Sequence, residues 1–63
     1  MTSWRVVHDE FLAGVWKTFP HLYENCKYPP VIGDGGELLI TDESGHERVI
    51  IGRGRWHTVE KVT

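Results

Sequence analysis

The sequence predicts a small α+β domain, in which a three-stranded antiparallel meander is covered by one N-terminal helix. Two short apolar runs, residues 38–40 and 49–51, flank a polar segment, which is the pattern of a β-hairpin. Apolar residues recur with a helical period over residues 9–19. A third run rich in aromatic and β-branched residues follows Gly54. A helix packed on one face of such a meander is a stable two-layer arrangement.

Length and composition indicate one domain, residues 1–63, near the lower limit for a chain that folds alone. The single Cys26 excludes an internal disulfide, and the net charge of −2 provides no strong field for polyanions. No apolar run approaches the ~20 residues that span a bilayer, and the first residues lack the apolar segment of a signal peptide. We therefore expect a cytoplasmic protein without a membrane partner.

The N-terminal third is predicted to form a short edge strand, residues 3–7, and then the helix, residues 9–19. Phe11, Leu12, Val15, Trp16 and Phe19 lie on one helical stripe. Asp9 is an acceptable N-cap, and Pro20 ends the helix. Gly14 costs about 1 kcal/mol against alanine within a helix, so a strand over residues 13–19 competes with this prediction.

Little regular structure is predicted for residues 21–36. Leu22, Tyr23 and Cys26 share one face of a single helical turn, and Pro29-Pro30 then favours an extended chain. The glycine-rich residues 33–36 form a turn before the hairpin.

The central hairpin has a predicted register. Asp42 is placed opposite His46, and Gly45 takes the left-handed conformation that closes a type I turn with a bulge. Counting outward, Leu39 faces Val49, so the apolar runs put residues on both faces of the hairpin. Both faces are then expected to need cover.

A third strand, residues 55–62, is predicted after a tight turn at residues 52–54. Strands joined in sequence by short turns make a meander. The alternative fold is a small SH3-like β-barrel with residues 20–36 as one long loop, because a closed barrel would also shelter two apolar faces.

Catalytic and metal sites are not indicated. A zinc motif has paired ligands at close spacing, whereas the nearest pair of ligand types, His21 and Cys26, is five residues apart. No nucleophile motif surrounds Cys26. We expect a protein that is not an enzyme, with no metal and no cofactor.

The alternative functional hypothesis is nucleic-acid binding by the turn at residues 52–57. Arg53 and Arg55 would contact phosphates, while Trp56 would stack on a base. The acidic net charge and the small size of this basic patch weigh against it.

The preferred hypothesis is protein binding, because three Trp, two Tyr and two Phe exceed what so small a core can bury. Trp, Tyr and Arg are enriched at binding hot spots. The candidate partner-binding residues are Trp4, Tyr23, Tyr28, Arg53, Arg55 and Trp56. A small module of this kind suits an accessory protein or inhibitor of a larger machine, and an exposed strand edge would also permit self-association as a homodimer.

Overall fold

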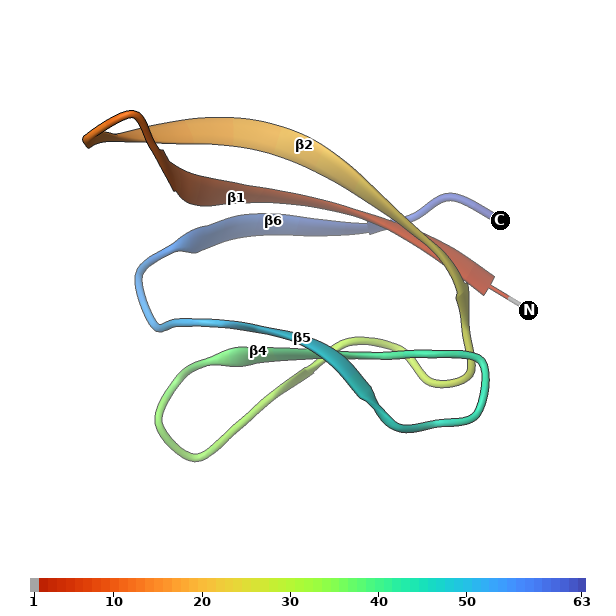
Figure 1. Cartoon of the computed structure of the whole chain (residues 1–63). Helices are drawn as coiled ribbons and strands as arrows, with labels where there is room; N and C mark the ends of the chain where they lie inside the picture. Colours follow the sequence, from red (N-terminus) through yellow and green to blue (C-terminus); the bar gives the residue numbers. More distant parts are fainter. Residues whose placement is uncertain (1) are drawn as a thin grey trace.

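The computed structural model describes residues 2–63 as two three-stranded antiparallel sheets facing each other (Figure 1). One sheet has the strand order β2-β1-β6 and the other β3-β4-β5. The strands are β1 (Thr2–Leu12), β2 (Val15–Cys26), β3 (Val31–Ile32), β4 (Leu38–Thr41), β5 (Glu47–Ile51) and β6 (Trp56–Lys61).

Residues 2–63 contain no helix, so the predicted α+β fold is wrong. Residues 9–19 instead form the ends of β1 and β2, joined by a two-residue turn. Ala13 and Gly14 have φ values of 51° and 82°, and two consecutive positive φ angles are the signature of a type I′ hairpin turn. None of the described residues belongs to a helix long and apolar enough to cross a membrane.

The helical period has a physical explanation in this hairpin. Across a two-residue turn, Leu12 pairs with Val15 and Phe11 with Trp16, at separations of three and five residues. A separation of three is also that of neighbours on a helix face, and residues 11 and 15 of the two strands are four apart, so a tight apolar hairpin imitates a helical stripe. Gly14, the residue least compatible with a helix, is the turn residue.

The alternative barrel hypothesis shares with the structure the absence of a helix among residues 2–63. Its long loop over residues 20–36 is wrong, because β2 continues to Cys26 and β3 occupies residues 31 and 32. The predicted edge strand over residues 3–7 exists, but β1 is the central strand of its sheet.

The third strand occurs as β6, yet the meander is wrong. β6 pairs with β1 in the other sheet, where Val6 faces Val59, and not with β5. The turn before it closes with a hydrogen bond from the Arg55 amide to the Gly52 carbonyl at 3.0 Å. The chain therefore leaves one sheet at this turn and enters the other.

The β4–β5 hairpin confirms the predicted turn but changes the register beyond it. The Asp42 amide donates to the His46 carbonyl at 2.8 Å, and Gly45 has a φ of 89°. Thr41 pairs with Glu47 as predicted, but a β-bulge follows and Ile40 pairs with Val49 instead of Arg48. The extra residue moves the remaining pairs by one position.

Because of the bulge, most apolar side chains of the β4–β5 hairpin face the other sheet. Leu38, Ile40 and Ile51 are buried there with Val6 and Cys26, and together they form the core. On the opposite face Ile50 is 56% exposed. The expectation that both faces of this hairpin are covered is therefore wrong, because one inserted residue places the larger apolar set on a single face.

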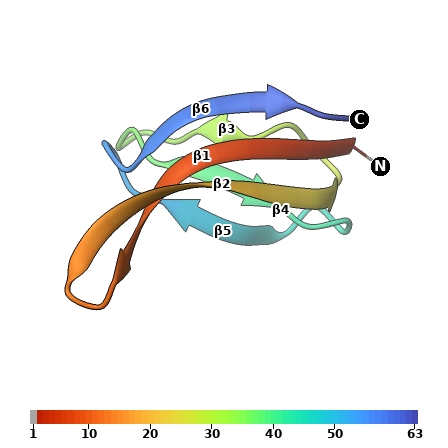
Figure 2. The ribbon, with the colours of Figure 1, turned by 90° about the horizontal axis from the view of Figure 1, so that it is seen from above.

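The β1–β2 hairpin extends beyond the two-sheet body. The pairing of β1 with β6 ends at His8, and one further backbone hydrogen bond runs from the Asp9 amide to the Arg55 carbonyl at 2.7 Å. Residues 10–19, here called the arm, continue as a two-stranded ribbon that curls away from the rest of the molecule (Figure 2).

Candidate functional site

The arm exposes five large apolar side chains within ten consecutive residues. Their exposed fractions run from 37% for Phe19 to 58% for Phe11. The complete set is Phe11, Leu12, Val15, Trp16 and Phe19. Isolated apolar residues are ordinary on a protein surface, but a contiguous apolar element is typical of an interaction site.

These side chains occupy both faces of the arm. Directly paired residues of an antiparallel ribbon lie on one face, and successive residues alternate. The Phe11–Trp16 pair therefore lies on one face, with its rings edge to face and their centroids 5.3 Å apart. Leu12 and Val15 pair on the other face.

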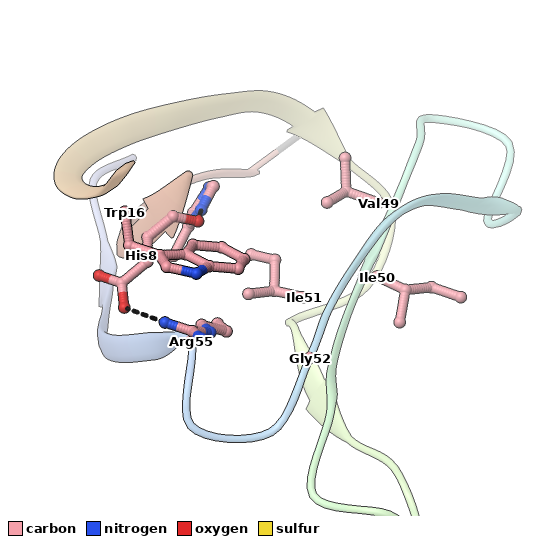
Figure 3. Close-up of a pocket in the computed structure, with 8 residues that line it drawn as sticks. His8, Trp16, Val49, Ile50, Ile51, Gly52 and Arg55 are labelled. Atoms are coloured by element: carbon pink, nitrogen blue, oxygen red, sulfur yellow. Dashed lines mark hydrogen bonds and ion pairs between the residues drawn. The ribbon is translucent and has the colours of Figure 1, made fainter. Parts of the chain in front are cut away.

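Arg55 connects the arm to the body. Its guanidinium carbon lies 3.5 Å from the centroid of the Trp16 ring, a close cation–π contact. Figure 3 shows the two groups side by side at the mouth of a pocket. The pocket has a volume of about 250 Å³ and is lined by His8, Asp9, Trp16, Val49, Ile50, Ile51, Gly52 and Arg55.

Asp9 organises the polar side of this pocket. Its carboxylate accepts hydrogen bonds from the Thr18 hydroxyl at 2.5 Å and from His57 Nε2 at 2.9 Å. Arg55 Nη1 lies 3.8 Å from Asp9 Oδ2, so the carboxylate also forms an ion pair with Arg55. The Thr18 hydrogen bond, followed by the His57 contact, lowers the pKa of Asp9 below its ordinary value, so the carboxylate is anionic at neutral pH.

A second polar cluster lies at the root of the arm, where β1 and β2 pair. The imidazole rings of His8 and His21 stack with centroids 3.9 Å apart, and Glu10 Oε1 lies 3.0 Å from His21 Nε2. One possible ligand atom from each of these three residues lies within 4.8 Å of the other two. Within residues 2–63, this is a group of side chains arranged so that it could hold a metal ion.

His8 is the buried member of the cluster, with 5% of its surface exposed. Its Nε2 lies 2.7 Å from the Tyr23 hydroxyl, and its Nδ1 lies 3.3 Å from the Asp9 carbonyl. Burial lowers the pKa of His8 and raises that of Tyr23, so both groups favour their neutral forms.

Three of the six predicted partner-binding residues, Trp4, Tyr23 and Trp56, pack against the core. Trp4 and Tyr23 are paired across β1 and β2, and both pack on the buried cluster while remaining partly exposed. The indole Nε1 of Trp4 is buried without a hydrogen-bond partner among the described residues. The Tyr23 hydroxyl is hydrogen-bonded to His8 Nε2.

Tyr28 and the pair Arg53 and Arg55 lie at opposite ends of β5. Tyr28 is 51% exposed beside Gly45, at the β4–β5 turn. Arg53 and Arg55 lie at the β5–β6 turn, where Arg53 is exposed. Trp56 is half-buried, and its Nε1 donates to the Gly36 carbonyl at 3.1 Å. The six residues therefore do not form one continuous surface.

The arm and the histidine cluster were not predicted from the sequence. The signal for the arm was the Ala13-Gly14 pair between apolar residues, which suits a two-residue hairpin turn. The signal for the cluster was weaker, because His8 and His21 meet only through the pairing register of β1 with β2.

No protein-family model matches the chain, and neither a curated protein nor a solved structure matches it. The fold and the site define its class by themselves. It is a small all-β protein with two antiparallel sheets and a projecting apolar hairpin.

Proposed function

We propose that the protein is a small non-enzymatic binding module that docks another protein through its apolar arm. The observation that carries this proposal is the exposure of five large apolar side chains on residues 10–19. Exposed apolar surface of this kind is costly in water, and its burial in an interface is favourable by about 25 cal/mol per Å². Aromatic residues such as Trp16 are also the usual hot-spot anchors.

The distribution of these side chains favours a cleft in the partner over a flat surface. Apolar residues occupy both faces of the arm, so a flat surface would leave one face in water. A back-to-back pair of arms from two copies would likewise leave one face bare on each copy. A different protein with an apolar cleft that admits a hairpin is therefore the occupant we propose.

The alternative function, nucleic-acid binding by the β5–β6 turn, has less support. Arg55 stacks on Trp16 and lies beside Asp9, while Trp56 donates its indole hydrogen bond to Gly36. These groups already interact within the molecule. The arm contributes one acidic and one basic residue, Glu10 and Lys17, and so offers no cationic surface for phosphates.

The test is affinity capture with the tagged chain from its own host cells, followed by reconstitution with the purified captured protein. Phe11→Ala and Trp16→Ala should each weaken the reconstituted complex by at least about 2 kcal/mol, or roughly 30-fold in Kd. The matched control is Ile32→Ala, because Ile32 is 62% exposed but lies on β3. This control should bind as the wild type does.

Four outcomes would overturn the proposal. One is equal loss of binding in Ile32→Ala and Trp16→Ala. Another is self-association, measured by sedimentation, that Trp16→Ala abolishes, since the occupant would then be a second copy. The third and fourth are arm-dependent binding to phosphatidylcholine vesicles and binding to an oligonucleotide.

A further inference from the structure

We propose that His8, Glu10 and His21 form a binding site for a single divalent transition-metal ion, with zinc as the reference ion. This inference is independent of the docking function, because it rests on the root of the arm and not on the exposed apolar residues. It departs from the sequence-based expectation of no metal, which considered only ligands close together along the chain.

The pairing of β1 with β2 is what assembles the ligands. Val6 faces His21 and His8 faces Phe19, so His8 and His21 are diagonal neighbours on one face of the ribbon. Glu10 follows His8 by two residues and therefore shares that face. Two imidazole nitrogens and a carboxylate oxygen make a set that suits zinc and neighbouring first-row metals.

The separations are close to those that one ion requires. Zinc binds imidazole nitrogen and carboxylate oxygen at about 2.0–2.2 Å, so its ligand atoms lie roughly 3–3.5 Å apart. His21 Nε2 and Glu10 Oε1 are already 3.0 Å apart. One ligand atom of His8 lies within 4.8 Å of a ligand atom of each of the other two residues. Because the His8 and His21 rings are stacked at an interplanar angle of 14°, at least one ring must turn out of the stack for both nitrogens to face a single ion.

The hydrogen bonds of His8 prepare it as a ligand. A backbone carbonyl can only accept, so the contact of Nδ1 with the Asp9 carbonyl places the ring proton on Nδ1. The Nε2 lone pair then faces the Tyr23 hydroxyl. A histidine whose second ring nitrogen donates to a carbonyl is the usual arrangement around protein-bound metals.

His21 provides an independent indication. Its Nε2 is buried but lacks a hydrogen-bond partner among the described residues, although it lies 3.0 Å from Glu10 Oε1. A buried polar atom without a hydrogen bond is costly, and a metal ion between this nitrogen and the carboxylate would remove that cost. The Glu10 side chain is 38% exposed, so an ion can reach the site from solvent.

The test is a zinc titration of the full chain after removal of metal by a chelator. Calorimetry should give one ion per chain, and Tm should rise with zinc concentration because zinc binds the folded state. His21→Ala and Glu10→Gln should each weaken zinc binding by at least about tenfold. Tyr23→Phe should retain binding, because the phenol competes for His8 Nε2.

The matched control is His46→Ala, since His46 is exposed in the β4–β5 turn and should not affect zinc binding. Imidazole ¹⁵N shifts of the wild type give a readout that requires no variant to fold. Zinc should move the signals of His8 and His21 but leave those of His46 and His57 in place. Absence of zinc binding, shifts confined to other histidines, or undiminished binding in both His21→Ala and Glu10→Gln would overturn the site.

Discussion

The guanidinium group of Arg55 lies over the indole ring of Trp16, with 3.5 Å between the guanidinium carbon and the ring centroid. Arg55 immediately precedes β6, whereas Trp16 belongs to the arm. Asp9 lies 3.8 Å from the same guanidinium group. Through these contacts Arg55 joins the arm to the β5–β6 turn.

The first prediction concerns this contact. In a double-mutant cycle of Arg55→Gln and Trp16→Leu, measured by urea unfolding, the coupling energy should be about 0.5–1 kcal/mol, the usual value of a partly exposed cation–π pair. The cycle separates this energy from the loss of the Arg55–Asp9 contact, because that contact is absent in both variants that carry glutamine. Strict additivity of the two substitutions would show that the stacking contributes nothing.

The second prediction distinguishes a hairpin from a helix by the sign of one substitution. Gly14 has a φ of 82°, so Gly14→Ala should destabilise the fold by about 1–2 kcal/mol. Ala13→Asn should stabilise it slightly, since asparagine tolerates the φ of 51° better than alanine. In a helix Gly14→Ala would instead stabilise by about 1 kcal/mol, so a higher Tm in this variant would contradict the hairpin.

The third prediction tests whether the β4–β5 hairpin is covered on one face only. Ile51 is 6% exposed and Ile50 is 56% exposed, although the two are neighbours of identical chemistry. Ile51→Ala should lower the free energy of unfolding by about 2–4 kcal/mol, whereas Ile50→Ala should cost less than about 1 kcal/mol. Chemical denaturation of both variants measures the difference, and similar losses would favour a hairpin that is covered on both faces.

The fourth prediction is a pH dependence located at the β4–β5 turn. Asp42 Oδ1 accepts backbone hydrogen bonds from His46 at 3.0 Å and Ser44 at 2.9 Å, and the former contributes most to lowering the pKa of Asp42. A lowered pKa in the folded state stabilises the protein above the ordinary value, about 3.9, and this contribution is lost as pH falls through the lower folded value.

Asp42→Asn should therefore reduce the acid-induced loss of stability in urea unfolding between roughly pH 5 and pH 2. Glu43→Gln, which changes the exposed neighbouring carboxylate in the same turn, is the matched control. An unchanged pH profile in Asp42→Asn would exclude this role for the turn.

The local features of the fold were predictable, and the non-local ones were not. The Asp42–Gly45 turn follows from residue types whose conformational preferences act over a few positions. The pairing of β6 with β1 depends on how the whole chain packs, which no short pattern specifies. The bulge at Arg48 was also missed, and there the guanidinium group donates to the Glu24 carbonyl of a distant strand.

The candidate site was predictable in kind but not in place. The excess of aromatic residues indicated that several rings must remain exposed, and the structure exposes Phe11, Trp16 and Tyr28. The choice between Trp16 and Trp4 depends on where the pairing of β1 with β6 ends, which is a property of the assembled sheet. The register of β1 with β2 brings His8 against His21.

The most direct test of the docking role is amide hydrogen exchange of residues 10–19 in the isolated protein and in the complex with the captured partner. In the isolated protein these amides lie in a two-stranded ribbon outside the core and should exchange faster than those of Val6 or Ile40. In the complex they should become protected, while residues 31–36 keep their exchange rates. Unchanged exchange in the arm, with protection elsewhere, would contradict the proposed interface.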